Sequence, residues 1–253
     1  MINKKILSEI ISKYSLGGNI EKVKWNINEE GNINIIFKTD SKSLAGKVEY
    51  KDNIGLKKGN YGIYETSHLI KCLNILDSDI LIDTKSSNGL ASKLNLADTN
   101  YDIKFNLADP AVIPIVNMDP INHLSSIEPN ATFEVNDEFI TRFVKSKDAL
   151  NDIETFTIEI QEEGLTGDEI LFTMGSNITR GTIQFKIDEK SKILNSFEQM
   201  SFDSNLFKEI LKANRNYKSG KINIYELGCI HLSFHYDDGF NTDYYLTRLQ
   251  NNN

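Results

Sequence analysis

Residues that could support catalysis are few in this chain, and their spacing does not favour it. His231 and His235 stand four positions apart in a strand-like run, so both would lie on one face of the strand. At the usual strand rise their Cα atoms would be about 13 Å apart, too far to ligate one metal ion without a sharp bend. We therefore predict no metal site.

No other residue pattern indicates an active site. His68 and His123 accompany no Ser or Cys nucleophile motif, and no glycine-rich phosphate loop is present. The acidic pairs at 29–30, 162–163 and 237–238 fall in turn-like segments, where carboxylates are common for conformational reasons. We predict a non-enzyme with no catalytic residues and no cofactor. An enzyme using a carboxylate pair distant in sequence remains an alternative, which a deep pocket with perturbed carboxylates would favour.

The composition is that of a globular protein. The 253 residues are 40% hydrophobic and 25% charged, enough for one large or two medium cores. No apolar run approaches the roughly 20 residues that span a bilayer, and the first residues lead into an amphipathic segment, so we expect a cytoplasmic protein. Cys72 and Cys229 form no disulfide framework and are expected to be reduced.

Four short segments share one pattern of apolar residues at i, i+1, i+4 and i+5, broken only by Asn74 at the last position of the second segment. They begin at Ile6, Leu69, Phe139 and Leu206, and so recur every 63 to 70 residues. This spacing fills one side of a helical period, so each segment is predicted to be a short amphipathic helix. Regular recurrence of helices between period-2 runs indicates an internally duplicated architecture.

Basic residues are placed on the outward side of these helices. With the apolar stripe against a sheet, a 100° step per residue points the bases away from it. The net charge is −8, yet the helical segments together are positive, so the rest of the chain is more acidic than the whole. An acidic chain with such a layer could hold a polyanion there, although ordinary solubilising surface is the alternative. The candidate bases are Lys5, Lys71, Arg142, Lys145, Lys208, Lys212 and Arg215, with Lys4 and Lys13 at the borders.

The order of elements is predicted to be a helix, four strands, a helix and three strands, and then the same order again. All four prolines fall between residues 107 and 130, which we predict to be an extended connector. We therefore predict domains at 1–107 and 131–253, joined by a connector at 108–130.

This order resembles that of the ring-shaped DNA polymerase sliding clamps, particularly those of T-even-like tailed phages. Local echoes are the segment Leu107-Ala108-Asp109-Pro110 and the helix opening Asp137-Glu138-Phe139. The resemblance implies an α+β fold of two similar clamp domains, made of duplicated helix-plus-antiparallel-strand units that assemble into a ring. It implies a processivity factor for DNA replication, located in the host cytoplasm if phage-encoded.

The resemblance also implies partners and interfaces. It implies a head-to-tail homotrimer around double-stranded DNA, served by a clamp loader and tethering a DNA polymerase. A duplicated β-rich virion structural or assembly protein is the main alternative. The implied subunit interface is formed by two edge strands from neighbouring subunits. One strand contains Tyr101, Ile103 and Phe105, and the other contains Thr182, Ile183, Gln184 and Phe185. Partner peptides would dock on Val112, Ile113, Pro114, Ile115, Val116, Tyr244 and Leu246, unless these residues merely pack the connector onto the sheet.

Overall fold

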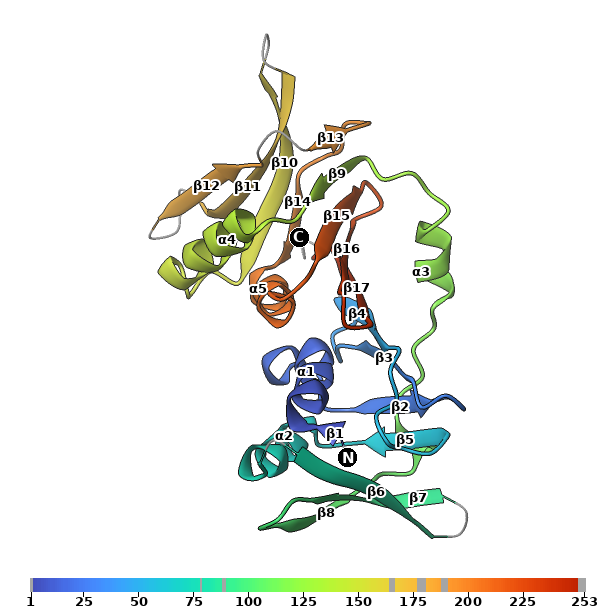
Figure 1. The fold of residues 1–253 in the computed structure, drawn as a ribbon. Helices are drawn as coiled ribbons and strands as arrows, with labels where there is room; N and C mark the ends of the chain where they lie inside the picture. The colour runs from blue at the N-terminus through green and yellow to red at the C-terminus, as the bar shows by residue number, and fades with distance from the viewer. Residues whose placement is uncertain are drawn as a thin grey trace. The chain divides into compact units, whose positions relative to one another are not determined.

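A computed structural model describes residues 2–77, 79–87, 90–163, 167–176, 181–187 and 191–249 (Figure 1). Within these residues no helix combines the length and the apolar character needed to cross a membrane. The chain divides into two compact units. Unit 1 comprises Met1–Thr39, Gly46–Val116 and Asp237–Thr242, and unit 2 comprises Asp40–Ala45, Asn117–Tyr236 and Asp243–Asn253.

The N-terminal half carries a helix-and-strand order that matches the prediction. Helix α1 is followed by a short 3-10 turn and four strands, and helix α2 by three strands. In chain order these are β1 (Ile2–Asn3), α1 (Lys4–Ser15), η1 (Leu16–Gly18), β2 (Val23–Ile27), β3 (Ile33–Lys38), β4 (Leu44–Tyr50), β5 (Gly59–Ile63), α2 (Thr66–Ile75), β6 (Asp79–Ser87), β7 (Leu90–Ala97) and β8 (Asp102–Asn106). The strands pair in the orders β5-β2-β3-β4 and β1-β6-β7-β8.

The C-terminal half repeats this plan. Its elements are β9 (Ala131–Glu134), α4 (Asp137–Ala149), β10 (Thr155–Glu163), β11 (Gly167–Gly175), β12 (Thr182–Lys186), β13 (Lys192–Ile193), β14 (Met200–Asp203), α5 (Ser204–Ala213), β15 (Ser219–Tyr225), β16 (Cys229–His235) and β17 (Phe240–Thr247). The strand orders are β14-β10-β11-β12 and β13-β9-β15-β16-β17. Strand β14 therefore corresponds to β5, and β9 to β1, so the α+β fold is an internal duplication.

Side-chain caps explain where three of the helices begin. Asn3 accepts a hydrogen bond from the Lys5 backbone N–H at 2.8 Å, and Asn136 accepts one from Phe139 N–H at 2.7 Å. Asp203 accepts bonds from the N–H groups of Asn205 and Leu206, each at 2.9 Å. These carbonyl and carboxylate oxygens satisfy donors that the first helical turn leaves without intrahelical partners.

Aromatic packing holds the helices of unit 2 on their sheet. The ring centroids of Phe143 on α4 and Phe207 on α5 lie 4.6 Å apart, and Phe156 on β10 lies within 5.0 Å of both. All three side chains are fully buried. Burying side chains of this size contributes about 2 kcal/mol or more each, so this cluster fixes the rotation of both helices.

The connector differs from the extended segment that the prolines predicted. It contains a 3-10 turn, η2 (Pro110–Val112), and a short helix, α3 (Asp119–Leu124). In each, a proline occupies the first turn, where its missing N–H is not needed for helical bonding. The predicted order of helices and strands also lacked three short strands that the structure contains, β1, β9 and β13.

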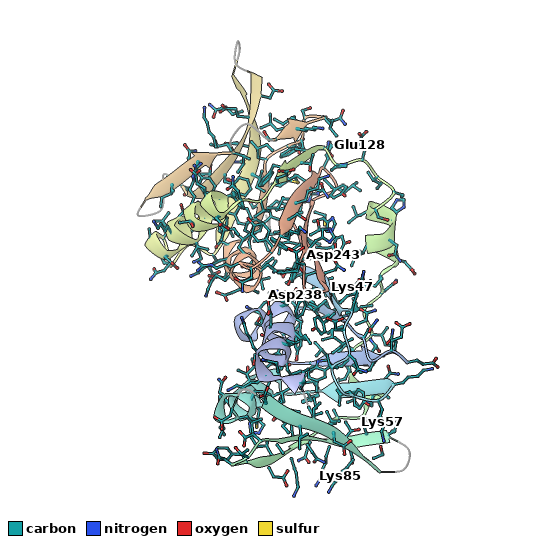
Figure 2. The ribbon with its side chains drawn as sticks, in the orientation of Figure 1. Lys47, Lys57, Lys85, Glu128, Asp238 and Asp243 are labelled. Carbon is teal, nitrogen blue, oxygen red and sulfur yellow. The ribbon has the colours of Figure 1, made fainter. Side chains whose placement is uncertain are left out.

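Lys13 is fully buried, which removes it from any outward basic face. Its Nζ lies 3.3 Å from the Glu9 carboxylate and 5.0 Å from the Phe240 ring centroid. Burial lowers the pKa of the Lys13 ammonium, and the charges of Glu9 and Asp238 (labelled in Figure 2) oppose this shift. Lys13 is therefore part of the core of unit 1.

We expect Glu9→Gln to lower the free energy of unfolding by about 2 kcal/mol, because it removes the carboxylate that lies 3.3 Å from a buried ammonium. Lys13→Met should stay within about 1 kcal/mol of wild type at pH 7. Because the folded-state pKa of Lys13 is depressed, the wild type should gain stability relative to Lys13→Met as pH rises towards 10.5. Urea denaturation at several pH values measures the free energy of unfolding of each variant. A larger loss of stability for Lys13→Met than for Glu9→Gln would contradict this account.

Candidate functional site

The outward faces of α4 and α5 lie opposite the aromatic cluster of unit 2. Helix α4 buries Phe139, Ile140, Phe143 and Val144, and α5 buries Leu206, Phe207, Ile210 and Leu211. The two helices pack against each other, as Figure 1 shows. Their solvent side therefore forms one surface, which carries Arg142, Lys145, Lys208, Lys212 and, just beyond α5, Arg215.

Three of these bases are engaged with carboxylates on the same surface. Lys208 pairs with Asp148 across the two helices, and Lys212 pairs with Glu209 at 2.9 Å. Arg142 pairs with Glu138 and also donates to the Lys186 carbonyl at 3.0 Å. The hydrogen bond from Lys208 is the main cause that lowers the pKa of the exposed Asp148 carboxyl.

Lys145 and Arg215 are exposed, and the described residues give neither side chain a carboxylate partner. Beneath this surface Lys147 is buried and donates to the Asn151 carbonyl at 2.7 Å. Its pKa is lowered by burial and by the nearby Lys208 charge. The surface thus mixes two free cations with ion pairs that a competing anion could open.

In unit 1 the helices α1 and α2 also lie together, with Leu7, Ile10 and Leu69 among their buried residues. Lys5 and Lys71 are exposed. Lys4 is half-buried and donates to the Leu76 carbonyl near the end of α2, at 2.5 Å. Of the predicted bases in this unit, two, Lys5 and Lys71, are thus exposed.

The two strands predicted to form subunit contacts lie at sheet edges. Strand β8 ends the order β1-β6-β7-β8, and β12 ends the order β12-β11-β10-β14. Phe105 and Phe185 are buried, Ile103 and Ile183 are half-buried, and Tyr101, Thr182 and Gln184 are exposed. The Arg142 guanidinium lies 5.9 Å from the Phe185 ring centroid. An edge strand offers one row of backbone donors and acceptors to another chain.

A pocket of about 660 Å³ lies within unit 2, between α3, the β15–β16 turn and β17. Its volume is typical of ligand-binding pockets. Apolar and cationic side chains share its wall. The lining residues are Lys42, Ala45, Ile121, His123, Leu124, Leu227, Gly228, Cys229, Tyr245, Thr247 and Arg248.

The residues predicted to dock peptides lie mostly elsewhere. Tyr244 and Leu246 are fully buried, and their neighbours Tyr245 and Thr247 face the pocket instead. In the connector Ile113 is buried and Val116 half-buried, whereas Val112, Pro114 and Ile115 are exposed; none of the five lines the pocket. The connector contributes Ile121 and Leu124 to the apolar lining instead, one helical turn apart after Pro120.

His231 packs against Tyr245, a residue of the pocket wall. Its ring stacks on Tyr245 with centroids 4.4 Å apart and planes 3° apart, and its Nε2 lies 2.8 Å from an Asp243 carboxylate oxygen. Asp243 is labelled in Figure 2. His231 thus has a structural partner, and no group of three metal-ligating side chains occurs in the part of the chain that the structure describes.

No protein-family model and no curated protein sequence matches this chain. Solved structures do match it over nearly its whole length. Proliferating cellular nuclear antigen (PCNA) from Entamoeba histolytica has a TM-score of 0.72 at 14% identity, covering 98% of this chain and 96% of that one. A. fulgidus PCNA bound to the C-terminal region of FEN-1 has 0.71 at 13% identity, covering 100% and 98%.

A PCNA2–PCNA3 complex from Sulfolobus tokodaii has a TM-score of 0.67 at 12% identity, covering 98% of this chain and 97% of that one. These likenesses define the class of fold. The chain has the DNA-clamp fold of the PCNA type, with its two similar domains.

We expect Gly228→Ala to destabilise the turn beside the pocket by about 1–2 kcal/mol. Gly228 has a φ of +84°, and an added Cβ would lie 2.5 Å from Cδ of Arg248. Gly59→Ala is the matched control, since its Cβ would come no nearer than 3.6 Å to its neighbours. Urea denaturation of both variants checks this; equal stability losses would contradict the special role of Gly228.

Proposed function

We propose that this protein is a sliding clamp, a ring of identical copies that encircles double-stranded DNA and tethers a DNA polymerase. The observation that carries the proposal is the clamp fold along nearly the whole chain, with bases on the solvent side of the helices. In this role the protein is a scaffold without catalytic activity. A homotrimer, a clamp loader that opens the ring, and kinship with the clamps of T-even-like phages belong to the same proposal.

The edge strands supply a route to ring closure. Pairing of β8 from one copy with β12 of the next would join different surfaces, a head-to-tail arrangement that forms a ring when the rotation closes. Both strands are the outermost of their sheets. The PCNA2–PCNA3 complex from Sulfolobus tokodaii is a precedent for clamp chains that associate.

The DNA-facing set is proposed to be Lys5, Lys71, Arg142, Lys145, Lys208, Lys212 and Arg215, with Lys4 as a weaker contributor. Lys13 leaves the set because it is buried. Phosphate contacts carry no base information, which suits a protein that must slide. Since Arg142, Lys208 and Lys212 already hold carboxylates, each phosphate contact would replace an existing ion pair and remain weak.

Partner proteins are proposed to dock short peptides in the pocket of unit 2. Binding of the C-terminal region of FEN-1 to A. fulgidus PCNA supports peptide docking on this fold. The proposed site now consists of Ile121, Leu124, Leu227 and Tyr245, which are apolar or aromatic and line the pocket. Val112, Pro114 and Ile115 remain candidates for contacts outside it.

The double variant Lys208→Glu/Lys212→Glu should weaken DNA association at physiological salt, because it places carboxylates where phosphates would bind. Asp148→Asn should act in the opposite direction, since it frees Lys208 from its ion pair. We expect roughly a threefold or greater change each way in retention on primed circular DNA. Melting curves control for folding, and Lys85→Gln, an exposed lysine on β6, is the matched surface control.

Topology separates the clamp from a virion structural protein. Loaded protein should remain on circular DNA and be lost from linear DNA with free ends, and it should stimulate its polymerase on the circle. Equal retention on both DNA forms, with no stimulation, would contradict the proposal. Unchanged retention in both charge variants would instead contradict the assigned DNA-facing residues.

Light scattering should give a mass near three times the 28.7 kDa of one chain at micromolar concentration. Ile183→Arg, on the edge strand β12, should shift this mass towards the monomer without unfolding the protein, because a charge would be buried at the paired edge. Ile75→Arg, an exposed position on α2, is the control. A monomeric wild type would contradict the ring.

A further inference from the structure

The pocket of unit 2 is lined by positively charged side chains, although the chain as a whole is acidic. Three of its lining residues, Lys42, His123 and Arg248, can carry positive charge, and none of the described residues that line it is a carboxylate. The whole chain has a net charge of −8. A cationic rim around an apolar wall is therefore a local feature and not a consequence of composition.

Arg248 is held over the pocket by the backbone. Its N–H donates to the Gly228 carbonyl at 2.8 Å, and its side chain crosses Gly228 where a Cβ would come 2.5 Å from Cδ. Only glycine leaves that space and readily adopts the φ of +84°. The guanidinium stem is thus seated before any ligand arrives, which reduces the entropy cost of an ion pair.

Lys42 reaches the rim from a strained loop. Its φ is +61°, and it is one of two non-glycine residues with positive φ in the described part of the chain. Such a conformation costs a β-unbranched residue about 1 kcal/mol. The Lys42 side chain is exposed and lines the same pocket as Arg248.

The nearest carboxylate on the pocket-facing side of β17 is already engaged. Asp243 shares its face with Tyr245 and Thr247, but its carboxylate lies 2.8 Å from His231 Nε2. Asp243 therefore does not neutralise Arg248, and no carboxylate in the described part of the chain forms an ion pair with Arg248. The apolar wall beneath includes Leu227, which is 67% exposed, and the Tyr245 ring seated on His231.

We propose that this pocket selects peptides that combine apolar or aromatic side chains with a carboxylate, which Arg248 and Lys42 bind. The inference rests on the proposed peptide-docking function and specifies the class of partner. The carboxylate is an acidic side chain or the peptide's own C-terminus, and both have the same chemistry. Arg248 presents a planar fork that matches a carboxylate, whereas Lys42 acts as a point charge.

A displayed library of random decapeptides, panned on the full-length protein, tests the proposal. Wild type should enrich sequences with Asp or Glu beside Leu, Ile, Phe or Trp. The double variant Lys42→Asn/Arg248→Gln should lose the acidic enrichment while keeping the apolar one. Asparagine tolerates the positive φ of residue 42, and glutamine keeps part of the stem over Gly228. Lys85→Gln is the matched control and should behave as wild type.

Fluorescence anisotropy with the best enriched peptide then measures the charge contribution. The C-terminally amidated acidic peptide should bind wild type about tenfold more tightly than its Asn/Gln twin, and the double variant should bind both equally. The same Asn/Gln twin with a free C-terminus separates the two sources of the carboxylate. If its affinity for wild type rises to that of the acidic peptide, the bound carboxylate is the C-terminus. If its affinity does not rise, the bound carboxylate is the acidic side chain.

The outcomes distinguish this inference from the function on which it rests. Enriched peptides without acidic excess, together with an amidated neutral twin that binds wild type as tightly as the acidic peptide and as its own free-C-terminus form, would overturn the charge selectivity and leave peptide docking intact. No enrichment on wild type would overturn the docking site itself. Melting curves for each variant exclude loss of folding as the cause.

Discussion

The burial of one apolar stripe on each helix is the constraint from which the candidate DNA-facing surface follows. Phe143 and Phe207 are fully buried in the aromatic cluster of unit 2. Each such side chain contributes about 2 kcal/mol or more, whereas an exposed ion pair contributes about 0–1 kcal/mol. The core therefore decides how α4 and α5 are rotated, and the bases point outward because the aromatic residues point inward.

The ion pairs on that outward surface are consistent with weak binding of a polyanion. Lys208 and Asp148 lie on different helices, and both have access to solvent. Since an exposed pair is worth little, exchanging a carboxylate for a phosphate changes the free energy only slightly. In the proposed clamp, such a surface would attract DNA without holding it at one position, which is the balance that a sliding ring would require.

Much of the fold was predictable because the helical periodicity was strong: the four apolar segments predicted to be helices lie within α1, α2, α4 and α5. The candidate site was less predictable. Lys13 stands at the border of the apolar stripe of α1. Its angular position around the helix axis alone therefore does not tell whether the lysine is buried or exposed. Tyr244 and Tyr245 are adjacent and chemically alike, and a shift of one residue exchanges the two faces of a strand. A proline breaks a helix when it stands in the interior, but Pro120 stands in the first turn of α3, which carries Ile121 and Leu124 to the pocket.

The positive charge of the pocket would act on a peptide only at short range, where the net negative charge of the whole protein matters little. At physiological ionic strength the screening length is about 8 Å, so a distant acidic peptide meets the repulsion of an acidic chain only weakly. Within the pocket, Arg248 and Lys42 are close enough to act directly. Selectivity for a carboxylate would then arise after encounter, from the ion pair formed in contact, and would appear mainly in the rate of dissociation. An acidic protein can in this way retain acidic partners without attracting them from solution.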